Sequence, residues 1–241
     1  MTRALPLILL GLAAGLAPGT AAAQEAAAGL DALLGGTSLT LTSVQLIALL
    51  TVLSLAPGIA ITVTCFPFIV TVLSILRQAI GLQAAPPNML IVSLALFLTY
   101  FVMEPVATAA WEAGVGPFTR GELSLTEAAP RALEPFRVFM EARVDPDTVE
   151  HMAALRPDAP PGATSVLVPS FLLSEIARAF QIGFLVFMPF LIIDMVVAAV
   201  LMSMGMMMVP PAIVSLPFKL AFFVAVDGWA LVAGALVAGY S

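Results

Sequence analysis

Cysteine, histidine and charge are all scarce in this sequence of 241 residues. The single cysteine, Cys65, excludes a disulfide within the chain and any metal cluster built on cysteine ligands. The single histidine, His151, has no second ligand at the spacing of a zinc site, and nothing in the sequence places a serine or acid against it. A glycine-rich phosphate loop and an HExxH pair are also missing. We therefore expect no enzyme, no bound metal and no cofactor.

Basic residues are few and scattered along the chain. Nine lysines and arginines stand against fifteen acids, which gives a formal net charge of −6. Because no run of basic residues could follow a phosphate backbone, we expect no binding to nucleic acid. Most of the acids and five of the arginines lie between positions 104 and 158. That stretch has the composition of a segment that faces water.

Apolar residues dominate everywhere else. They make up 61% of the chain, charged residues make up 10%, and the mean hydropathy is +1.09. Soluble domains carry roughly 45–50% apolar and about 25% charged residues. A chain this apolar cannot face water on all sides, so lipid or partner subunits must cover most of it.

The N-terminus has the pattern of an export signal. Arg3 precedes a short apolar run, and small residues at positions 21–23 offer a cleavage point, so we predict a signal peptide over residues 1–23. The alternative is a first membrane anchor. Gly11, Gly15 and Pro18 interrupt the run and favour removal. Residues 24–42 would then form a flexible lead.

Four hydrophobic blocks follow, at residues 43–76, 89–110, 168–204 and 209–239. The first is too long for one straight helix that crosses a bilayer, which needs about 20 residues. We predict an all-α integral membrane protein of broken hydrophobic helical hairpins, with a small polar helical subdomain inserted between the second and third blocks. Its parts are a first hydrophobic region (43–110), the polar subdomain (111–167) and a second hairpin with a Met-rich loop (168–241).

Proline and glycine interrupt these blocks repeatedly. The interruptions fall at Pro57-Gly58, Pro67, Pro189, Gly205, Pro210-Pro211 and Pro217. Each one frees backbone groups that lipid cannot satisfy, so irregular backbone is tolerated only against protein or a water-filled cavity. One interpretation is kinked helices in an ordinary bundle. We favour helices buried in a body of several subunits.

Orientation and the polar segment are weakly specified. Arg77 and Lys219 lie near short loops, which places those loops in the cytoplasm and the polar segment in the periplasm. Within the segment, Leu133, Phe136 and Met140 recur at helical spacing. We expect a helical subdomain that makes lateral contacts between copies, and a solvated connector is the alternative.

Charged residues inside the hydrophobic blocks are the candidates for assembly or an ion relay. An ionised Asp194 or Asp227 in an apolar helix costs roughly 2.5–3.5 kcal/mol on insertion scales. Lys219 and Arg178 are the natural counter-charges. Glu175 lies three residues before Arg178 and can pair with it locally. We favour structural ion pairs over a proton or ion relay, and a protease built on the two aspartates would lack any recognisable motif.

The densest methionine cluster lies at the turn between the last two blocks. Five of the seven residues at 202–208 are methionine. Methionine is unbranched and polarizable, so such a cluster conforms to changing shapes while staying apolar. This predicts a deformable channel gasket made of Met204, Met206, Met207 and Met208. Ordinary core filling is the alternative.

These motifs together resemble the FliP/SctR family of type III protein export gate subunits. The residues that carry the resemblance are 76–81 (LRQAIG), 86–88 (PPN), 94–99 (LALFLT), 168–184 (VPSFLLSEIARAFQIGF), 189–194 (PFLIID), 205–211 (GMMMVPP), 216–219 (LPFK) and 226–229 (VDGW). The signal peptide fits the flagellar branch better than the injectisome branch. The chain departs from the family pattern at Phe68, Met89 and Glu104.

The resemblance implies a non-enzymatic, channel-forming subunit of the flagellar export gate in the bacterial inner membrane and flagellar basal body. It implies several copies of the chain assembled with FliQ-like and FliR-like subunits, onto which FlhA-like and FlhB-like components dock. The cargo would be unfolded flagellar proteins, and the Met-rich loop would constrict the channel. The alternatives are the equivalent injectisome subunit and an ion-coupled secondary transporter that uses Asp194 and Asp227.

Overall fold

The computed structural model describes residues 38–82 and 86–240. The chain divides near Pro57 into two compact units, and helix α3 (Ser38–Thr62) runs across the boundary. Within the described residues every regular element is a helix, so the predicted all-α class is confirmed. The predicted signal peptide and most of the lead lie outside the described residues. The last five residues of the predicted lead, from Ser38, are already helical.

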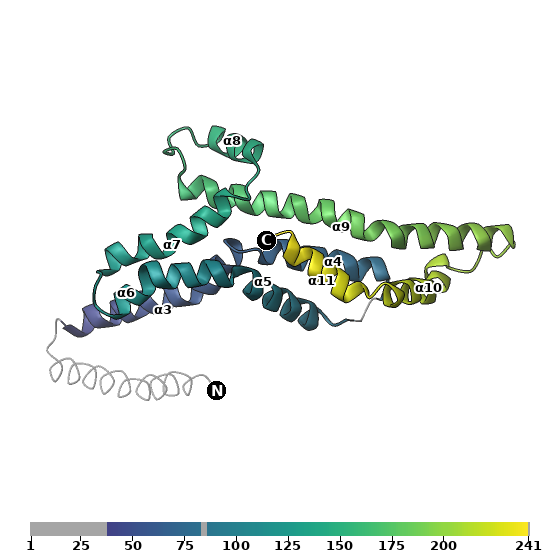
Figure 1. Cartoon of the computed structure of the whole chain (residues 1–241), viewed down its shortest axis with the longest axis horizontal. Helices are drawn as coiled ribbons and strands as arrows, with labels where there is room; N and C mark the ends of the chain where they lie inside the picture. The colour runs from purple at the N-terminus through teal and green to yellow at the C-terminus, as the bar shows by residue number, and fades with distance from the viewer. Residues whose placement is uncertain (1–37, 83–85, 241) are drawn as a thin grey trace, which may run out of the picture. The chain divides into compact units, whose positions relative to one another are not determined.

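The second unit is organised around α4 (Phe66–Ile80), which packs against α5 (Asn88–Ala110), α9 (Thr164–Ser203) and α10 (Pro211–Ala225). Its buried face repeats at three- and four-residue steps, which is the pattern of an amphipathic helix. The members of that face are Ile69, Val72, Leu73, Leu76 and Ile80. Figure 1 shows α4 lying along the long helix α9. The main hydrophobic core therefore surrounds α4.

Two glycines allow close helix contacts, one with the side chain of Ile75 and one with the backbone of α7. A β-carbon at Gly183 of α9 would lie 2.3 Å from Ile75 Cδ1 of α4. After α5 the chain continues through the π-helix η1 (Trp111–Val115) and α6 (Gly116–Thr119). A β-carbon at Gly114 would lie 2.5 Å from the backbone oxygen of Ala128 in α7 (Leu125–Glu141). Only glycine lets these helices lie so close.

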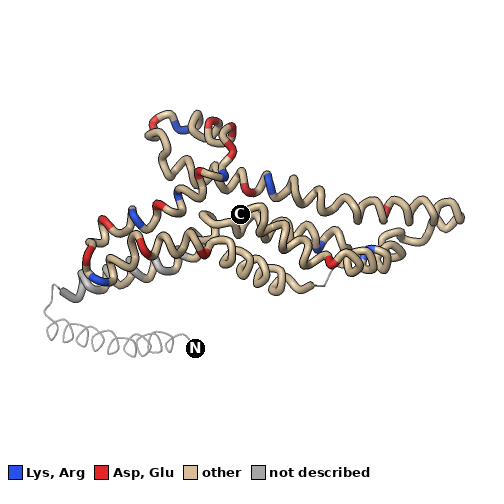
Figure 2. Tube along the Cα trace, in the orientation of Figure 1, with Lys and Arg blue, Asp and Glu red and all other residues tan. Residues whose placement is uncertain are grey.

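The polar segment is helical, as predicted, and is part of the second unit. It contains α7 and α8 (Pro146–Ala154), and most of the acidic and basic residues lie here (Figure 2). An ion pair one helical turn apart joins Arg137 to Glu141 at 2.8 Å on the exposed side of α7. The predicted apolar stripe is partly wrong, because Met140 is buried whereas Leu133 is 64% exposed. Because η1 approaches α7 so closely at Gly114, the α7 side chains in this contact are alanines and not Leu133.

Proline breaks the helices less often than the sequence predicts. Pro57, Pro189 and Pro217 all lie inside continuous helices, so the interruptions predicted there are wrong. A proline removes one N–H donor and kinks a helix, but it need not end one whose neighbouring turns are apolar and packed. The breaks predicted at Pro67 and at the Gly205–Pro211 turn are confirmed, since each of these prolines begins a helix.

One break went unpredicted. After α10 the chain bends by 61° before α11 (Gly228–Ala238). Asp227 occupies the bend with φ 49°, in the left-handed region. By length and composition, Asn88–Thr119 and Thr164–Ser203 could each cross a membrane, and the bent pair α10–α11 could make a third span.

Replacing Gly114 by alanine should loosen α7 from η1. The new methyl group would meet backbone atoms that cannot turn aside, and such overpacking costs roughly 1–3 kcal/mol. Thermal unfolding of the full chain in detergent should show a lower midpoint. Gly234→Ala in α11 is the matched control, because nothing lies within 4 Å of a β-carbon there. Equal midpoints for the two variants would contradict the close approach.

Candidate Met-rich loop and buried charge clusters

The Met-rich loop begins where α9 is stopped by a glycine. Gly205 has φ +76°, and its N–H bonds the carbonyl of Met202 while the N–H of Met206 bonds the carbonyl of Leu201. This pair of bonds is a Schellman motif, which closes a helix with a left-handed residue. Pro211 then starts α10, where its missing N–H is harmless. The sequence therefore builds a short turn with a rigid helix on each side.

The four predicted gasket methionines fall into two pairs. Met207 and Met208 are 84% and 97% exposed, so their side chains touch almost nothing within the chain. Met204 and Met206 line an apolar groove of about 560 Å³ between α9 and α10. The other lining residues are Ile192, Ile193, Val196, Val197, Val200, Leu201, Val214 and Phe218. The loop thus presents two free thioether side chains at its tip and two at its base.

The first buried charge cluster joins α9 to α10. Lys219 Nζ lies 2.6 Å from Asp194 Oδ2, and the Ser215 hydroxyl donates to Asp194 Oδ1 at 2.5 Å. Lys219 also donates to the carbonyl of Ala79 in the last turn of α4, at 3.1 Å. A cation at a helix C-terminus satisfies a carbonyl that has no partner in the helix and complements the helix dipole. Lys219 therefore ties three helices together.

The second cluster surrounds Glu175, whose side chain is fully buried. Arg143 Nε lies 3.4 Å from Glu175 Oε1, and Arg178 Nη1 lies 3.9 Å from the same oxygen. The Tyr240 hydroxyl donates to Glu175 Oε2. Burial, and then the charge of Glu175, raise the pKa of Tyr240, so it stays protonated and keeps this hydrogen bond. The carboxylate has partners on both oxygens.

Two of the pairings predicted from sequence are not found. Arg178 lies beside Glu175 and donates to the backbone carbonyl of Arg143, and it does not pair with either aspartate. Asp227 is exposed at the bend before α11, so the single chain does not bury it, and its role in assembly or a relay stays a prediction. This exposure could not be predicted from the sequence, because the bend that separates Asp227 from the helix of Lys219 was itself unpredicted.

Arg143, Ser215 and Tyr240 are the partners that sequence reasoning missed. Ser215 lies one helical turn before Lys219, a spacing that could have revealed it. Arg143 lies in the charged segment and had the pattern of a solvated residue. Nothing in the sequence pattern linked Tyr240 to Arg143, because the two residues are 97 positions apart.

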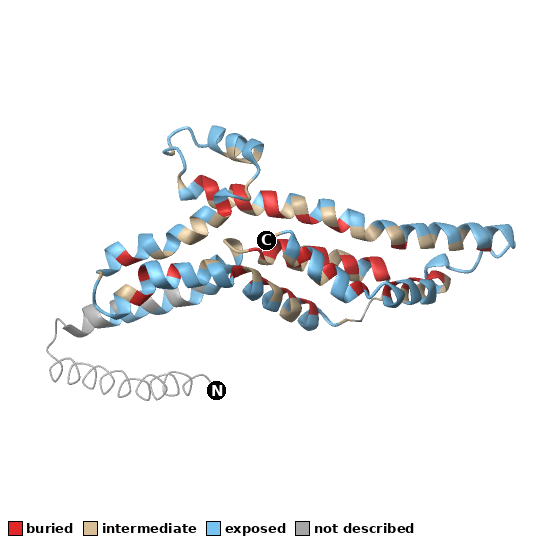
Figure 3. Ribbon diagram, viewed as in Figure 1, coloured by how far each residue is buried: buried red, intermediate tan, exposed pale blue. Residues whose placement is uncertain are grey.

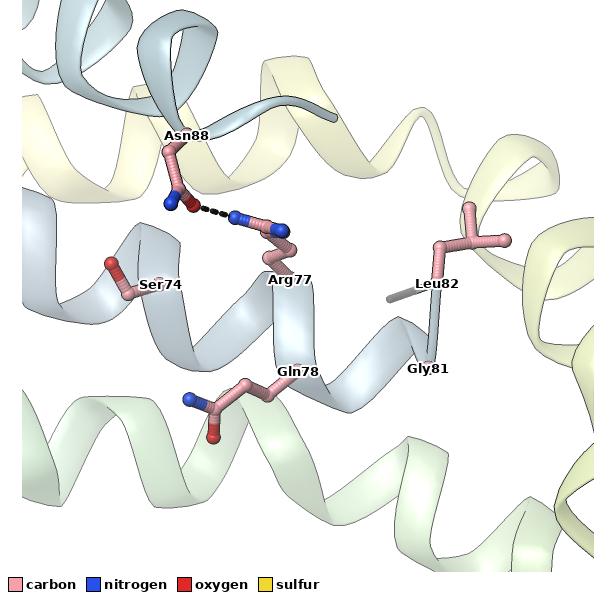
Figure 4. Close-up of a pocket in the computed structure, with 6 residues that line it drawn as sticks. All are labelled: Ser74, Arg77, Gln78, Gly81, Leu82 and Asn88. Carbon is pink, nitrogen blue, oxygen red and sulfur yellow. Dashed lines mark hydrogen bonds between the residues drawn. The ribbon is translucent and has the colours of Figure 1, made fainter. Parts of the chain in front are cut away.

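A cavity of about 600 Å³ with several polar lining residues lies at the end of α4. Arg77 Nη1 donates to Asn88 Oδ1, which joins α4 to the start of α5, and Gln78 points away from this bond (Figure 4). Gly81, with φ +86°, ends α4 at the edge of the cavity. These groups join the end of α4 to the start of α5.

The chemistry available to the described residues is limited. No cluster of three or more histidine, cysteine or acidic side chains that could hold a metal ion occurs in residues 38–82 and 86–240. Cys65 is buried beside α4, and burial raises its pKa to about 12. Its thiol is therefore un-ionised at neutral pH, as expected of a packed structural residue.

Comparison with known proteins decides the family. The model of the FliP family matches residues 49–236. The chain belongs to the FliP family. The flagellar biosynthetic protein FliP of Caulobacter vibrioides is 49% identical over 97% of this chain and 89% of that protein. Those of Rhizobium meliloti and Bacillus subtilis are each 46% identical over 82% of the chain, and the matches cover 83% and 92% of their own lengths.

The FliP match covers α4, α5, the polar segment, α9, α10 and most of α11. It therefore includes the Met-rich loop and the Asp194–Lys219 pair, and Tyr240 follows it. The family resemblance proposed from the sequence motifs is confirmed.

Asp194→Asn should destabilise the chain more than Lys219→Met. The first change leaves an ammonium whose side chain is only 7% exposed, whereas the second leaves a carboxylate that is 31% exposed and keeps its Ser215 bond. Because Asp194 is partly solvated, we expect losses of about 1–3 kcal/mol rather than the full cost of breaking a buried pair. Thermal unfolding in detergent measures both.

Asp227→Asn is the matched control for this comparison. Asp227 is exposed, and asparagine also tolerates a left-handed backbone, so the change should stay within about 0.5 kcal/mol. The described pairing is contradicted if Asp194→Asn is no more harmful than Asp227→Asn.

Proposed function

We propose that this chain is a core channel-forming subunit of the flagellar type III protein export gate, which moves unfolded flagellar proteins across the inner membrane. Membership of the FliP family supports a component of the flagellar export apparatus. The same membership favours a structural, non-enzymatic role over the transporter and protease alternatives. It also favours the flagellar system over an injectisome, because the named relatives are flagellar biosynthetic proteins.

The single observation that carries the channel role is the geometry of the Met-rich loop. A Schellman turn and a proline-started helix hold the loop on two rigid arms, while Met207 and Met208 stand free at its tip. A ring of such loops would close a pore with soft apolar side chains. A passing polypeptide could push them aside, because an unbranched thioether chain changes rotamer at low cost.

The exposed apolar surface supports assembly with other subunits. From Leu191 to the end of α9 only Leu201 is buried, and Figure 3 shows the C-terminal half of α9 as mainly exposed. Exposed apolar patches of this extent mark contacts with protein or lipid. We propose that further copies of the chain and FliQ-like and FliR-like subunits cover this surface. FlhA-like and FlhB-like components would then dock onto the assembly.

The same apolar surface supports a proposal for how the chain lies in the membrane. The apolar helices support a chain embedded in a membrane, and we propose the bacterial inner membrane, in the flagellar basal body. The predicted export signal favours a periplasmic polar segment. Helices α7 and α8 would then stand on the periplasmic side, where they contact neighbouring copies.

Alanine at Met206, Met207 and Met208 should make the assembled complex leak. Truncation removes the flexible side chains that fill the pore, so the uptake of a small impermeant dye into cells should rise severalfold. Met89→Ala is the control, because Met89 is 80% exposed but lies at the start of α5, away from the loop. Unchanged leakage in a complex that still assembles would refute the gasket.

Asp194→Asn separates a structural pair from an ion relay. Co-purification from detergent measures assembly, and secretion of flagellar proteins measures export. We expect the variant to lose partner subunits together with export, because the pair fixes α10 against α9 and α4. An intact complex without export would instead identify Asp194 as an ion-coupling residue.

A further inference from the structure

We infer that Tyr240 anchors the far end of the arm that returns from the Met-rich loop, and so couples that arm to the polar subdomain. The return arm consists of α10, the bend at Asp227, α11 and the two residues that follow, Gly239 and Tyr240. Its binding site, the Tyr240 socket, is made of Phe68 of α4, Phe139 of α7, Arg143 just after α7, and Glu175 of α9.

The aromatic part of the socket holds the ring on three sides. Phe139 stacks on Tyr240 with centroids 6.1 Å apart and planes 17° from parallel, and Phe68 meets it edge-on at 5.5 Å. The Arg143 guanidinium lies 3.7 Å from the ring centroid. Such cation–π and aromatic pairs prefer these geometries and fix the orientation of the ring. Side chains from α4, from α7 and from the segment just after α7 therefore contact the Tyr240 ring.

The polar part of the socket binds Tyr240, and the interactions of its own residues depend on the Tyr240 hydroxyl. Glu175 is fully buried, and its second oxygen receives the Tyr240 hydroxyl. Arg143 pairs with Glu175 and also donates to the carbonyl of Gly239 at 3.0 Å, so one guanidinium binds both the carboxylate and the arm's backbone. A buried carboxylate that loses a donor is destabilised. Removing the hydroxyl therefore disturbs Glu175 and Arg143 together.

The rest of the arm explains why this anchor matters. At the loop end, Lys219 fixes α10 to the last turn of α4 through the carbonyl of Ala79. At the far end, Tyr240 meets the first turn of α4 through Phe68. Between the two anchors lies the 61° bend, where Asp227 has a left-handed backbone and no side-chain cap. Without Tyr240, the arm keeps the bond from Arg143 to the carbonyl of Gly239 and the core packing of Val232 and Leu236, but it loses the ring contacts and the bond to Glu175, so α11 can pivot more easily at this bend.

Hydrogen exchange of the full chain in detergent tests the anchor. Tyr240→Ala should make the amides of α11 and the C-terminal half of α7 exchange at least about tenfold faster, because it removes both the hydrogen bond to a charged group and the contacts of the ring. The amides of α10 should exchange as in the wild type, since Lys219 still holds that helix. Tyr240→Phe keeps the ring and should restore part of the protection in α11.

Tyr100→Ala is the matched control, because it removes the only other tyrosine, which lies 70% exposed on α5. The inference is overturned if Tyr240→Ala leaves α11 unchanged, or if exchange rises equally in α10 and α11. Should Tyr240→Ala fail to fold, Tyr240→Phe decides: faster exchange confined to α11 and α7 supports the anchor, and wild-type exchange overturns it.

The inference deepens the proposed function by naming what holds the arm beneath the Met-rich loop. Exchange in the isolated subunit reports on the anchor alone, whereas dye leakage through the assembled complex reports on the channel. An anchored arm in a subunit that forms no channel would refute the proposed function and leave the anchor standing.

Discussion

The contact between α4 and α9 is the constraint on which the rest of the second unit depends. The two helices lie so close that Gly183 has no room for a side chain beside Ile75. The buried face of α4 then supplies the centre of the core, to which α5 and α10 attach. Apolar packing of this kind is strong but non-directional, and it leaves the positions of the attached helices along α4 open.

The buried charge clusters fix where the attached helices lie along α4. Lys219 joins α10 to Asp194 and to the carbonyl end of α4, and the cluster around Glu175 joins α7, α9 and the segment after α11. In an apolar environment an unpaired charge is far more costly than a misplaced methyl group, so each cluster permits one arrangement. We propose that the ion pairs act chiefly to fix the register of the helices, while the apolar contacts supply most of the stabilisation.

Much of the apolar surface remains uncovered within a single chain. The outer half of α9, the groove beside the Met-rich loop and the tips of Met207 and Met208 all stay exposed. Hydrophobic burial is therefore incomplete until lipid or other subunits cover these faces. We propose that assembly within the flagellar export apparatus, and not folding alone, completes these surfaces.

Composition and periodicity were enough for the all-helical class and the hydrophobic blocks, and the resemblance of the sequence motifs was enough for the family. Helix ends were predictable where backbone chemistry forces them, as at Gly205, where a left-handed turn is needed, and at Pro67 and Pro211, which begin helices. The prolines at 57, 189 and 217 misled the prediction. Whether a proline ends a helix depends on the packing of the turns around it, which pattern alone does not contain.

The sequence by itself determined which residues are apolar, which are charged and where methionine is concentrated, because these follow from side-chain chemistry alone. Tertiary structure decided which charges meet. Lys219 was expected near an aspartate, but only the fold selects Asp194 and leaves Asp227 exposed at a bend. Likewise, Arg143 and Tyr240 lie 97 positions apart and come together at Glu175 only because α4, α7 and α9 enclose that site. Pairing across such separations depends on helix packing, which no local pattern records.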